Sequence, residues 1–328
     1  TCALPIYWRK YDNSLIQPGE FDPIPEYPGN TSFDLSYVSV EENSSRQPIN
    51  YVLPPGIERE RDISTSQLAN LNEQSLTMKV CKLKDGDSRA AYKTTQLDIR
   101  TYKKLKMYIH AESSDAMHPL TDNELTAFIR IGSDFVDNYY EYEIPLHITQ
   151  PGELDPDRIW PEANNLEINL DELVAKKTER NNKMISDPSV TLLTPYPAYS
   201  GPATDKRIIV KGSPNLSNVR VIMIGLRNPK EPNNVNGVDL CGEVWVNELR
   251  LSGFDEKGGW AAIARVQAKL ADLGNVSVVG SHSTAGWGSI EKRVNERDKE
   301  DKTSYDVTTS MELGKFIPEK AGIRVPVF

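Results

Sequence analysis

The feature that most constrains this chain is an alternation of apolar and polar residues with a period of two. In residues 103–111, for example, Leu105, Met107 and Ile109 alternate with polar or amphipathic side chains. Such alternation places one face of a strand against a core and leaves the other in water, as in antiparallel sheets. The pattern predicts strands over residues 103–111, 124–131, 139–146, 206–211, 219–226, 243–251, 260–270, 276–283 and 305–313.

The first six of these strands, with turn residues between them, predict an all-β fold. We expect a jelly-roll-like β-sandwich domain over residues 75–255, interrupted by one short helix at about 170–180. Asn169 is positioned to cap that helix with Glu172, and Leu170 and Leu173 begin its apolar stripe. Residues 7–74 are rich in proline and predict an extended segment wrapped over a neighbouring domain, with a short strand only at 36–41.

Residues 256–328 differ from the preceding residues in the pattern of apolar and charged side chains. One face of the strand at 260–270 is apolar, and the other carries Arg265, Gln267 and Lys269. In the connection over residues 290–302, 10 of 13 residues are charged, so it must be solvated. These features match antiparallel strands of an incomplete outer-membrane β-barrel, the last two of which are joined through this charged loop. Three strands of a second soluble sheet would alternate in the same way, so the pattern leaves both open.

Composition narrows the possible partners. The 328 residues correspond to roughly two domains of about 150 residues. With 38 Lys and Arg against 47 Asp and Glu, the net charge is -9, which argues against a nucleic-acid partner. No apolar run approaches the roughly 18 residues of a membrane helix, which excludes a helical membrane protein.

The ionisable residues offer few candidate sites. The four histidines, His110, His118, His147 and His282, show no metal-binding spacing, and His110 is expected on a solvated strand face. Glu141 and Glu143 share one strand face about 7 Å apart. They are a glycosidase-like acid–base pair, a Ca²⁺ site or ordinary solvated charge. The turn at Asp134 and Asp137 is either a Ca²⁺ site or a simple acidic turn.

Aromatic and cysteine residues leave similar alternatives. Tyr139, Tyr140, Tyr142 and Trp160 would suit stacking on a sugar, or a core face with hydroxyls at its rim. Cys2 falls within residues 1–6, which are expected to be an artefact (see below). The two remaining cysteines, Cys81 and Cys241, indicate neither a disulfide framework nor a metal site. No phosphate-binding loop or nucleophile motif is present. We therefore predict no catalytic, cofactor-binding or metal residues and no cofactor, and we expect the protein not to be an enzyme.

Several longer motifs resemble one known family. They are Asp239–Leu251 (DLCGEVWVNELRL), Gly258–Ala262 (GGWAA), Ala271–Gly274 (ADLG), Tyr51–Ile57 (YVLPPGI), Leu97–Arg100 with Lys104–Met107, Ala127–Asp134 with Asn138–Tyr142, Gly225–Pro229 and Leu313–Lys320. Together they resemble the SprA/Sov family of Bacteroidota cell-surface proteins. The resemblance extends over nearly all of the chain after residue 7.

The resemblance implies a function as well as a fold. That family forms the outer-membrane translocon of the type IX secretion system, which is also linked to gliding motility. It implies a fragment of a giant β-barrel in the outer membrane at the cell surface, with a soluble insertion domain. The implied partners are secreted cargo proteins, a PorV-type outer-membrane protein, a periplasmic plug and outer-membrane lipid. A carbohydrate-binding module of a cell-surface adhesin is the alternative function.

The ends of the chain suggest a piece of a longer protein. Residues 1–6 (TCALPI) resemble a translated sequencing adapter and are expected to be an artefact of sequencing or assembly. The chain begins without Met and has no signal segment. We therefore expect an internal fragment.

Overall fold

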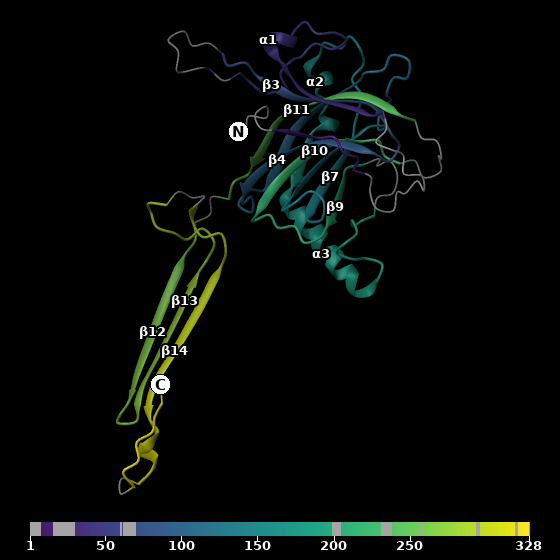
Figure 1. Ribbon diagram of the computed structural model, residues 1–328. Helices are drawn as coiled ribbons and strands as arrows, with labels where there is room; N and C mark the ends of the chain where they lie inside the picture. The colour runs from purple at the N-terminus through teal and green to yellow at the C-terminus, as the bar shows by residue number, and fades with distance from the viewer. Residues whose placement is uncertain are drawn as a thin grey trace. The chain divides into compact units, whose positions relative to one another are not determined.

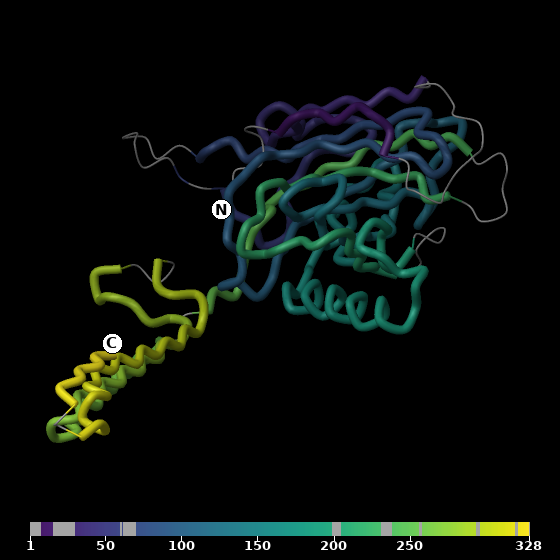
Figure 2. Tube along the Cα trace, turned by 60° about the horizontal axis from the view of Figure 1, so that its bottom comes forward, coloured from purple at the N-terminus to yellow at the C-terminus, as the bar shows by residue number. Residues whose placement is uncertain are grey.

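A computed structural model describes residues 8–15, 30–59, 61, 70–198, 205–230, 238–255, 258–292, 296–318 and 321–327. The chain forms two compact units, unit 1 (Thr1–Gly253) and unit 2 (Phe254–Phe328), which are considered separately (Figures 1 and 2). Every described ladder between named strands is antiparallel, so the predicted all-β class is confirmed. The predicted artefact at residues 1–6 lies outside the described residues.

Unit 1 is a sandwich of two sheets, as the alternation predicts. The six-stranded sheet has the order β1 (Arg9–Tyr11), β4 (Ser88–Leu97), β10 (Val219–Arg227), β6 (Thr126–Gly132), β7 (Tyr139–Pro145), β9 (Arg207–Lys211). The five-stranded sheet has the order β2 (Ser32–Ser39), β3 (Gln74–Leu83), β11 (Leu240–Ser252), β5 (Lys104–Ser113), β8 (Leu166–Asn169).

Two late strands occupy central positions in these sheets. β10 lies between β4 and β6, and β11 lies between β3 and β5, so each pairs with strands from much earlier in the chain. In Figure 1, β11 and β10 run between the strands of the first half of unit 1. Neither sheet is complete until its late strand has been added, which makes the fold dominated by long-range pairing.

The inner faces of the two sheets form one apolar core. The strand residues predicted to face inward are buried there, including Leu105, Met107 and Ile109 on β5. Each buried aliphatic side chain of this size contributes about 1.5–3 kcal/mol relative to an exposed one. The period of two therefore identifies the core-facing residues correctly.

The predicted boundaries of the sandwich need correction. β1 and β2 lie within residues 7–74, which we expected to be an extended segment, yet they pair with β4 and β3. The strand expected at 36–41 is instead Ser32–Ser39, and α1 (Val40–Asn43) follows it because the Ser39 side chain accepts a hydrogen bond from the backbone N–H of Glu42. Pairing with β3, which local proline content does not reveal, makes Ser32–Ser39 a strand.

The helices also differ from expectation. α3 (Leu170–Ser186) continues six residues beyond the predicted end. Within it, Arg180 is buried and donates to the backbone oxygen of Gly212 at 2.7 Å. Asn169 is the N-cap residue, but its side chain accepts no hydrogen bond from the helix backbone, and its Nδ2 donates to Glu172 Oε1 instead. Unit 1 has two further short helices, α2 (Pro156–Ile159) and the 3₁₀ helix η1 (Glu162–Asn164).

Unit 2 is an open sheet with the order β12 (Ala261–Leu270), β13 (Gly274–Ser283), β14 (Lys302–Glu312), β15 (Pro326–Val327). The 3₁₀ helix η3 (Leu313–Phe316) precedes β15. The three long strands correspond to those predicted at 260–270, 276–283 and 305–313. The described strands of unit 2 do not close on themselves, since β12 and β15 are at opposite edges.

Candidate functional site

The register of unit 2 assigns every side chain of its long strands to one of two faces. Val266 on β12 pairs with Val278 on β13, which in turn pairs with Val307 on β14. One position along, Gln267 pairs with Ser277, which pairs with Thr308. Residues paired across antiparallel strands lie on the same face, so apolar and polar rows alternate along the sheet.

The two faces differ in chemistry, although the polar face includes Ile263 and Val279 and the apolar face includes His282 and Thr303. The apolar face carries Ala262, Ala264, Val266, Ala268, Leu270, Val276, Val278, Gly280, His282, Thr303, Tyr305, Val307, Thr309 and Met311. The polar face carries Ala261, Ile263, Arg265, Gln267, Lys269, Asn275, Ser277, Val279, Ser281, Ser283, Lys302, Ser304, Asp306, Thr308 and Ser310.

The apolar face of unit 2 is not covered by the rest of the described unit. Every residue of β12 is exposed, and Val266, Tyr305 and Val307 are each more than 60% exposed. In the described part of the chain, the buried apolar core consists of unit 1 residues alone. A row of exposed valines on an open sheet is the kind of surface that marks an interaction with another apolar phase or partner.

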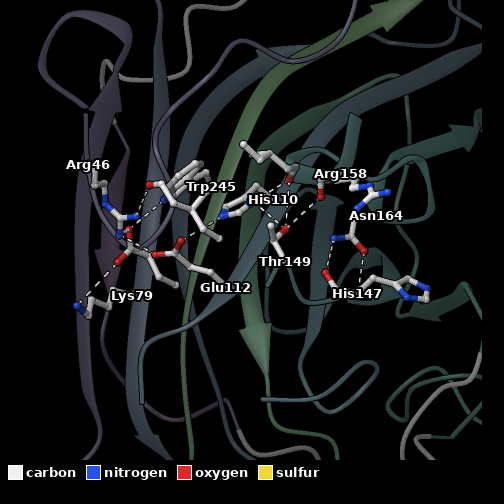
Figure 3. A network of polar contacts seen from close by, with 12 residues as sticks. Arg46, Lys79, His110, Glu112, His147, Thr149, Arg158, Asn164 and Trp245 are labelled. Atoms are coloured by element: carbon white, nitrogen blue, oxygen red, sulfur yellow. Dashed lines mark hydrogen bonds and ion pairs between the residues drawn. The ribbon is translucent and has the colours of Figure 1, made fainter. Parts of the chain in front are cut away.

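Unit 1 contains a polar cluster on the outer face of its five-stranded sheet, which we call the Arg46 cluster: Arg46, Lys79, His110, Glu112, Glu243 and Trp245 (Figure 3). Arg46 Nη2 donates to Glu112 Oε1 and to Glu243 Oε1, both at 2.7 Å. The guanidinium lies 5.1 Å from the Trp245 ring, and Lys79 approaches Glu243 at 3.8 Å. Arg46 thereby connects the segment before β3 to the two central strands β5 and β11.

The pKa values of this cluster reflect a balance of burial and pairing. Burial alone raises the pKa of Glu112, but hydrogen bonds and charge from His110 and Arg46 outweigh it and hold that pKa below its usual value. Burial likewise lowers the pKa of Arg46, and Glu112 and Glu243 more than compensate, so its pKa is raised. Both groups are therefore held in their charged forms.

His110 is fully buried, so the expectation that it lies on a solvated face was wrong. Its ring lies 4.0 Å from that of Trp245, and its Nδ1 is 2.7 Å from the backbone oxygen of Ile159. A carbonyl only accepts, so Nδ1–H donates this hydrogen bond. Nε2 then faces Glu112 Oε2 at 3.5 Å.

The physical reason is a layer of chain over this face. Ile49, Tyr51, Ile159 and Trp160 pack against Trp245. The covering segment is itself tied down, because Asn164 and the backbone of His147 exchange two hydrogen bonds of 2.8 and 2.9 Å (Figure 3).

Glu141 and Glu143 are also fully buried, so neither the acid–base pair nor the solvated-charge interpretation describes them. Arg130 and Arg227 contact Glu141, and Arg207 and Arg227 contact Glu143. Both carboxylates are thus occupied by guanidinium groups and shielded from solvent, which leaves no room for a sugar between them. Replacing such buried ion pairs by well-packed apolar residues is often neutral or stabilising, so the network is weak evidence for stability.

The acidic turn after β6 is organised by its own backbone. Asp134 Oδ1 accepts hydrogen bonds from the backbone N–H groups of Val136, Asp137 and Asn138, and these bonds outweigh burial and lower the pKa of Asp134. Asp137 contacts Lys211 at 3.1 Å. Across the described ranges, no group of three or more His, Cys, Asp or Glu residues is placed to hold a metal ion.

The four aromatic residues considered for sugar stacking are buried. Tyr139, Tyr140, Tyr142 and Trp160 are each at most 6% exposed. Burial raises the pKa of the Tyr140 and Tyr142 hydroxyls to about 12. The side chains are therefore unavailable as a stacking platform, and the core interpretation of the tyrosines on β7 agrees with their positions.

The remaining histidines lie apart from one another. His118 is near Asp115 at 3.5 Å, His147 near Asp122 at 3.1 Å, and His282 is 2.8 Å from Thr303 Oγ1 in unit 2.

Among the helices that the structure describes, none combines the length and apolar character that crossing a membrane requires.

Cys81 and Cys241 form a disulfide, which the sequence analysis did not predict. They lie on the adjacent strands β3 and β11, where the register shifts between Leu240 and Gly242 and Lys82 adopts a φ of 55°. This β-bulge places the two sulfurs together. Their separation of 160 residues gave no signal, because only the pairing of β3 with β11 brings them into contact.

Comparison with known protein families gives a match over almost the whole chain. A search of curated proteins finds no similar protein. A family described as motility related/secretion protein, SprA_N, matches residues 4–328 and so includes three of the six residues expected to be an artefact. Because this match spans almost the whole chain, the chain belongs to the SprA_N family of motility related/secretion proteins.

Proposed function

We propose that the chain is part of an outer-membrane conduit through which secreted proteins cross, with β12–β14 as strands of its wall and unit 1 as an attached structural domain. The family membership indicates a secretion-related protein of the cell envelope. The observation that carries the finer proposal is the two-faced sheet of unit 2, in which an exposed apolar face backs onto a polar one. A wall between lipid and water requires that arrangement.

Strand length supports the proposal. β12 and β13 have 10 residues each and β14 has 11. Strands that cross a bilayer at a tilt of about 45° need about 9–11 residues. Ten residues at about 3.3 Å each, tilted in this way, cover roughly 23 Å, which is close to the roughly 25 Å apolar band of outer-membrane barrels.

Aromatic side chains support it further. Trp260, Trp287 and Tyr305 are 56%, 44% and 84% exposed. Trp260 precedes β12 and lies 5.0 Å, ring to ring, from His282 near the end of β13. Aromatic residues at strand ends suit the interface between lipid and water, where their rings and polar atoms are both satisfied.

The disulfide in unit 1 supports an envelope location. Cys81–Cys241 requires a compartment in which thiols are oxidised, such as the periplasm or the cell surface, and reducing cytosol disfavours it. Unit 1 would therefore fold after export. Both the periplasmic and the external side of the outer membrane satisfy this condition.

The proposal assigns partners by the family resemblance. They are secreted cargo proteins, a PorV-type outer-membrane protein, a periplasmic plug and outer-membrane lipid. A conduit requires no catalytic group, and none is proposed. The alternative of a carbohydrate-binding module depended on exposed Tyr139, Tyr140, Tyr142 and Trp160, and no observation here favours it.

Paired cysteine variants at neighbouring positions test the proposal in the full-length protein in its native membrane. Ser277→Cys lies on the polar face and Val278→Cys on the apolar face of the same strand. We expect a membrane-impermeant maleimide to label the Ser277→Cys variant in permeabilised cells, and to label Val278→Cys only after detergent is added. Equal labelling of the two variants before detergent would refute a lipid-facing apolar face.

A further inference from the structure

The disulfide lies at one end of the ladder between β3 and β11. The ladder has five consecutive pairs, from Gly242 opposite Val80 to Val246 opposite Leu76. The bridge between Cys81 and Cys241 comes directly after the Gly242–Val80 pair. The chain enters β3 at Gln74 and leaves β11 at Ser252, at the other end of the ladder.

This geometry determines how tension would act on unit 1. A pull between the segment before β3 and the segment after β11 acts on two strand ends that lie at the same end of an antiparallel ladder. Such a pull separates the ladder one pair at a time and moves toward the bridge. β11 is at the same time removed from β5, with which it also pairs.

The last rows before the bridge are reinforced by charge. Glu243, next to the Gly242–Val80 pair, receives a hydrogen bond of 2.7 Å from Arg46 and lies 3.8 Å from Lys79. Both cations belong to the segment that would be pulled away from Glu243. As the two strands separate, the ion pairs of Glu243 are therefore broken just before the load reaches the Cys81–Cys241 bond.

We propose that Cys81–Cys241 is a mechanical stop. Once β1 has separated from β4, β2 from β3 and Arg46 from Glu112, tension between the N-terminal segment and unit 2 is carried through the bond, and residues 82–240 stay outside the path of the load. These residues include β4–β10 and most of the core strands. The bond would limit how far this member of a motility related/secretion family extends under tension. The inference goes beyond the proposed conduit and does not depend on it.

Single-molecule stretching of the whole chain tests the proposal. The chain is held by handles at its two ends in a Cys2→Ser background, so that Cys81 and Cys241 are the only cysteines. The bridge removes 160 residues from the extensible length. At about 3.5 Å per residue, the oxidised chain should extend roughly 560 Å less than the chain without the bridge.

Two comparisons complete the experiment. Dithiothreitol transfers two electrons and two protons to the disulfide, restoring two thiols while it forms its own cyclic disulfide, and should add the missing length. The Cys81→Ser/Cys241→Ser variant should show the full length without reductant. This result does not require the variant to fold, since only total extension is compared. An oxidised parent that extends as far as the variant, or that gains nothing from dithiothreitol, overturns the proposal.

Discussion

Replacing Arg46 by methionine should destabilise unit 1 by about 3–5 kcal/mol. The substitution keeps an unbranched side chain of similar length but removes the cation that Glu112 and Glu243 share. The side chains of these two glutamates are only 3% and 8% exposed, so their charges cannot be rehydrated without opening the fold. Removal of one partner from a buried ion pair costs about 3–5 kcal/mol for this reason.

The magnitude follows from the geometry. Charges about 4 Å apart interact by about 4 kcal/mol at an effective dielectric constant of about 20. Arg46 makes two such contacts, each with a nitrogen–oxygen distance of 2.7 Å, and its side chain is 19% exposed. In the parent protein, the cost of desolvating the ions offsets a large part of this attraction. The expected loss of stability on removing Arg46 alone is therefore about 3–5 kcal/mol and not the sum of the two contacts.

Urea unfolding followed by tryptophan fluorescence measures the effect. Trp245 lies 5.1 Å from the Arg46 guanidinium and reports directly on the Arg46 cluster. Trp260→Phe and Trp287→Phe in both proteins remove the signal of unit 2. The change in the free energy of unfolding is read from the shift of the midpoint at constant slope.

The variant should also change the dependence of stability on pH. The folded-state pKa of Glu112 lies below its ordinary value of 4.5, so its pairing stabilises the protein above that pH, and the contribution is lost as the pH falls through the lowered pKa. Arg46→Met removes one cause of the lowering. The parent should therefore lose more stability than the variant on acidification below pH 4.5.

A neutral triple variant is the control. Arg46→Met with Glu112→Gln and Glu243→Gln removes all three charges together and should cost much less than Arg46→Met alone, because no buried charge remains unpaired. If Arg46→Met costs under about 1 kcal/mol, as at an exposed ion pair, or if the triple variant is equally destabilised, the reasoning is refuted.

Two further predictions concern the bridge and the packing of unit 1. Cys81→Ser/Cys241→Ser should lower the free energy of unfolding by up to about 5 kcal/mol, the loop-entropy value for 160 residues, and a parent midpoint that dithiothreitol does not shift would contradict this. Gly225→Ala should cost about 1–3 kcal/mol, because its Cβ would lie 2.3 Å from the ring of Phe128 on the neighbouring strand. Gly258→Ala, where an added Cβ meets nothing within 4 Å, is the matched control, and equal urea midpoints for the two variants would refute the packing argument.

Much of the fold could be predicted from alternation alone. The predicted inward residues Ile109 and Ile129 are in the core, and Val266 and Gln267 lie on opposite faces of β12 as expected. Alternation failed where the pattern is weak. β1 and β2 are strands because they pair with β4 and β3. These partners cannot be inferred from the local sequence of a proline-rich segment.

The candidate sites were less predictable. The alternation predicts that His110, Glu141 and Glu143 lie on polar, solvated strand faces. All three are fully buried. Another segment of the chain covers His110, whereas arginines of neighbouring strands contact Glu141 and Glu143. Arg46, which has no motif around it, became the centre of a polar cluster only because the segment before β3 crosses the outer face of the sheet.

The sequence by itself determined which residues share a face of each strand, and with that the sandwich core and the two chemically different sides of unit 2. Only the tertiary structure decided which strand faces are exposed to solvent, which strands are neighbours in a sheet and which cysteines form a disulfide. The reason is physical. Side-chain alternation is a property of one extended strand, whereas burial and the Cys81–Cys241 bond depend on what the rest of the chain places opposite it.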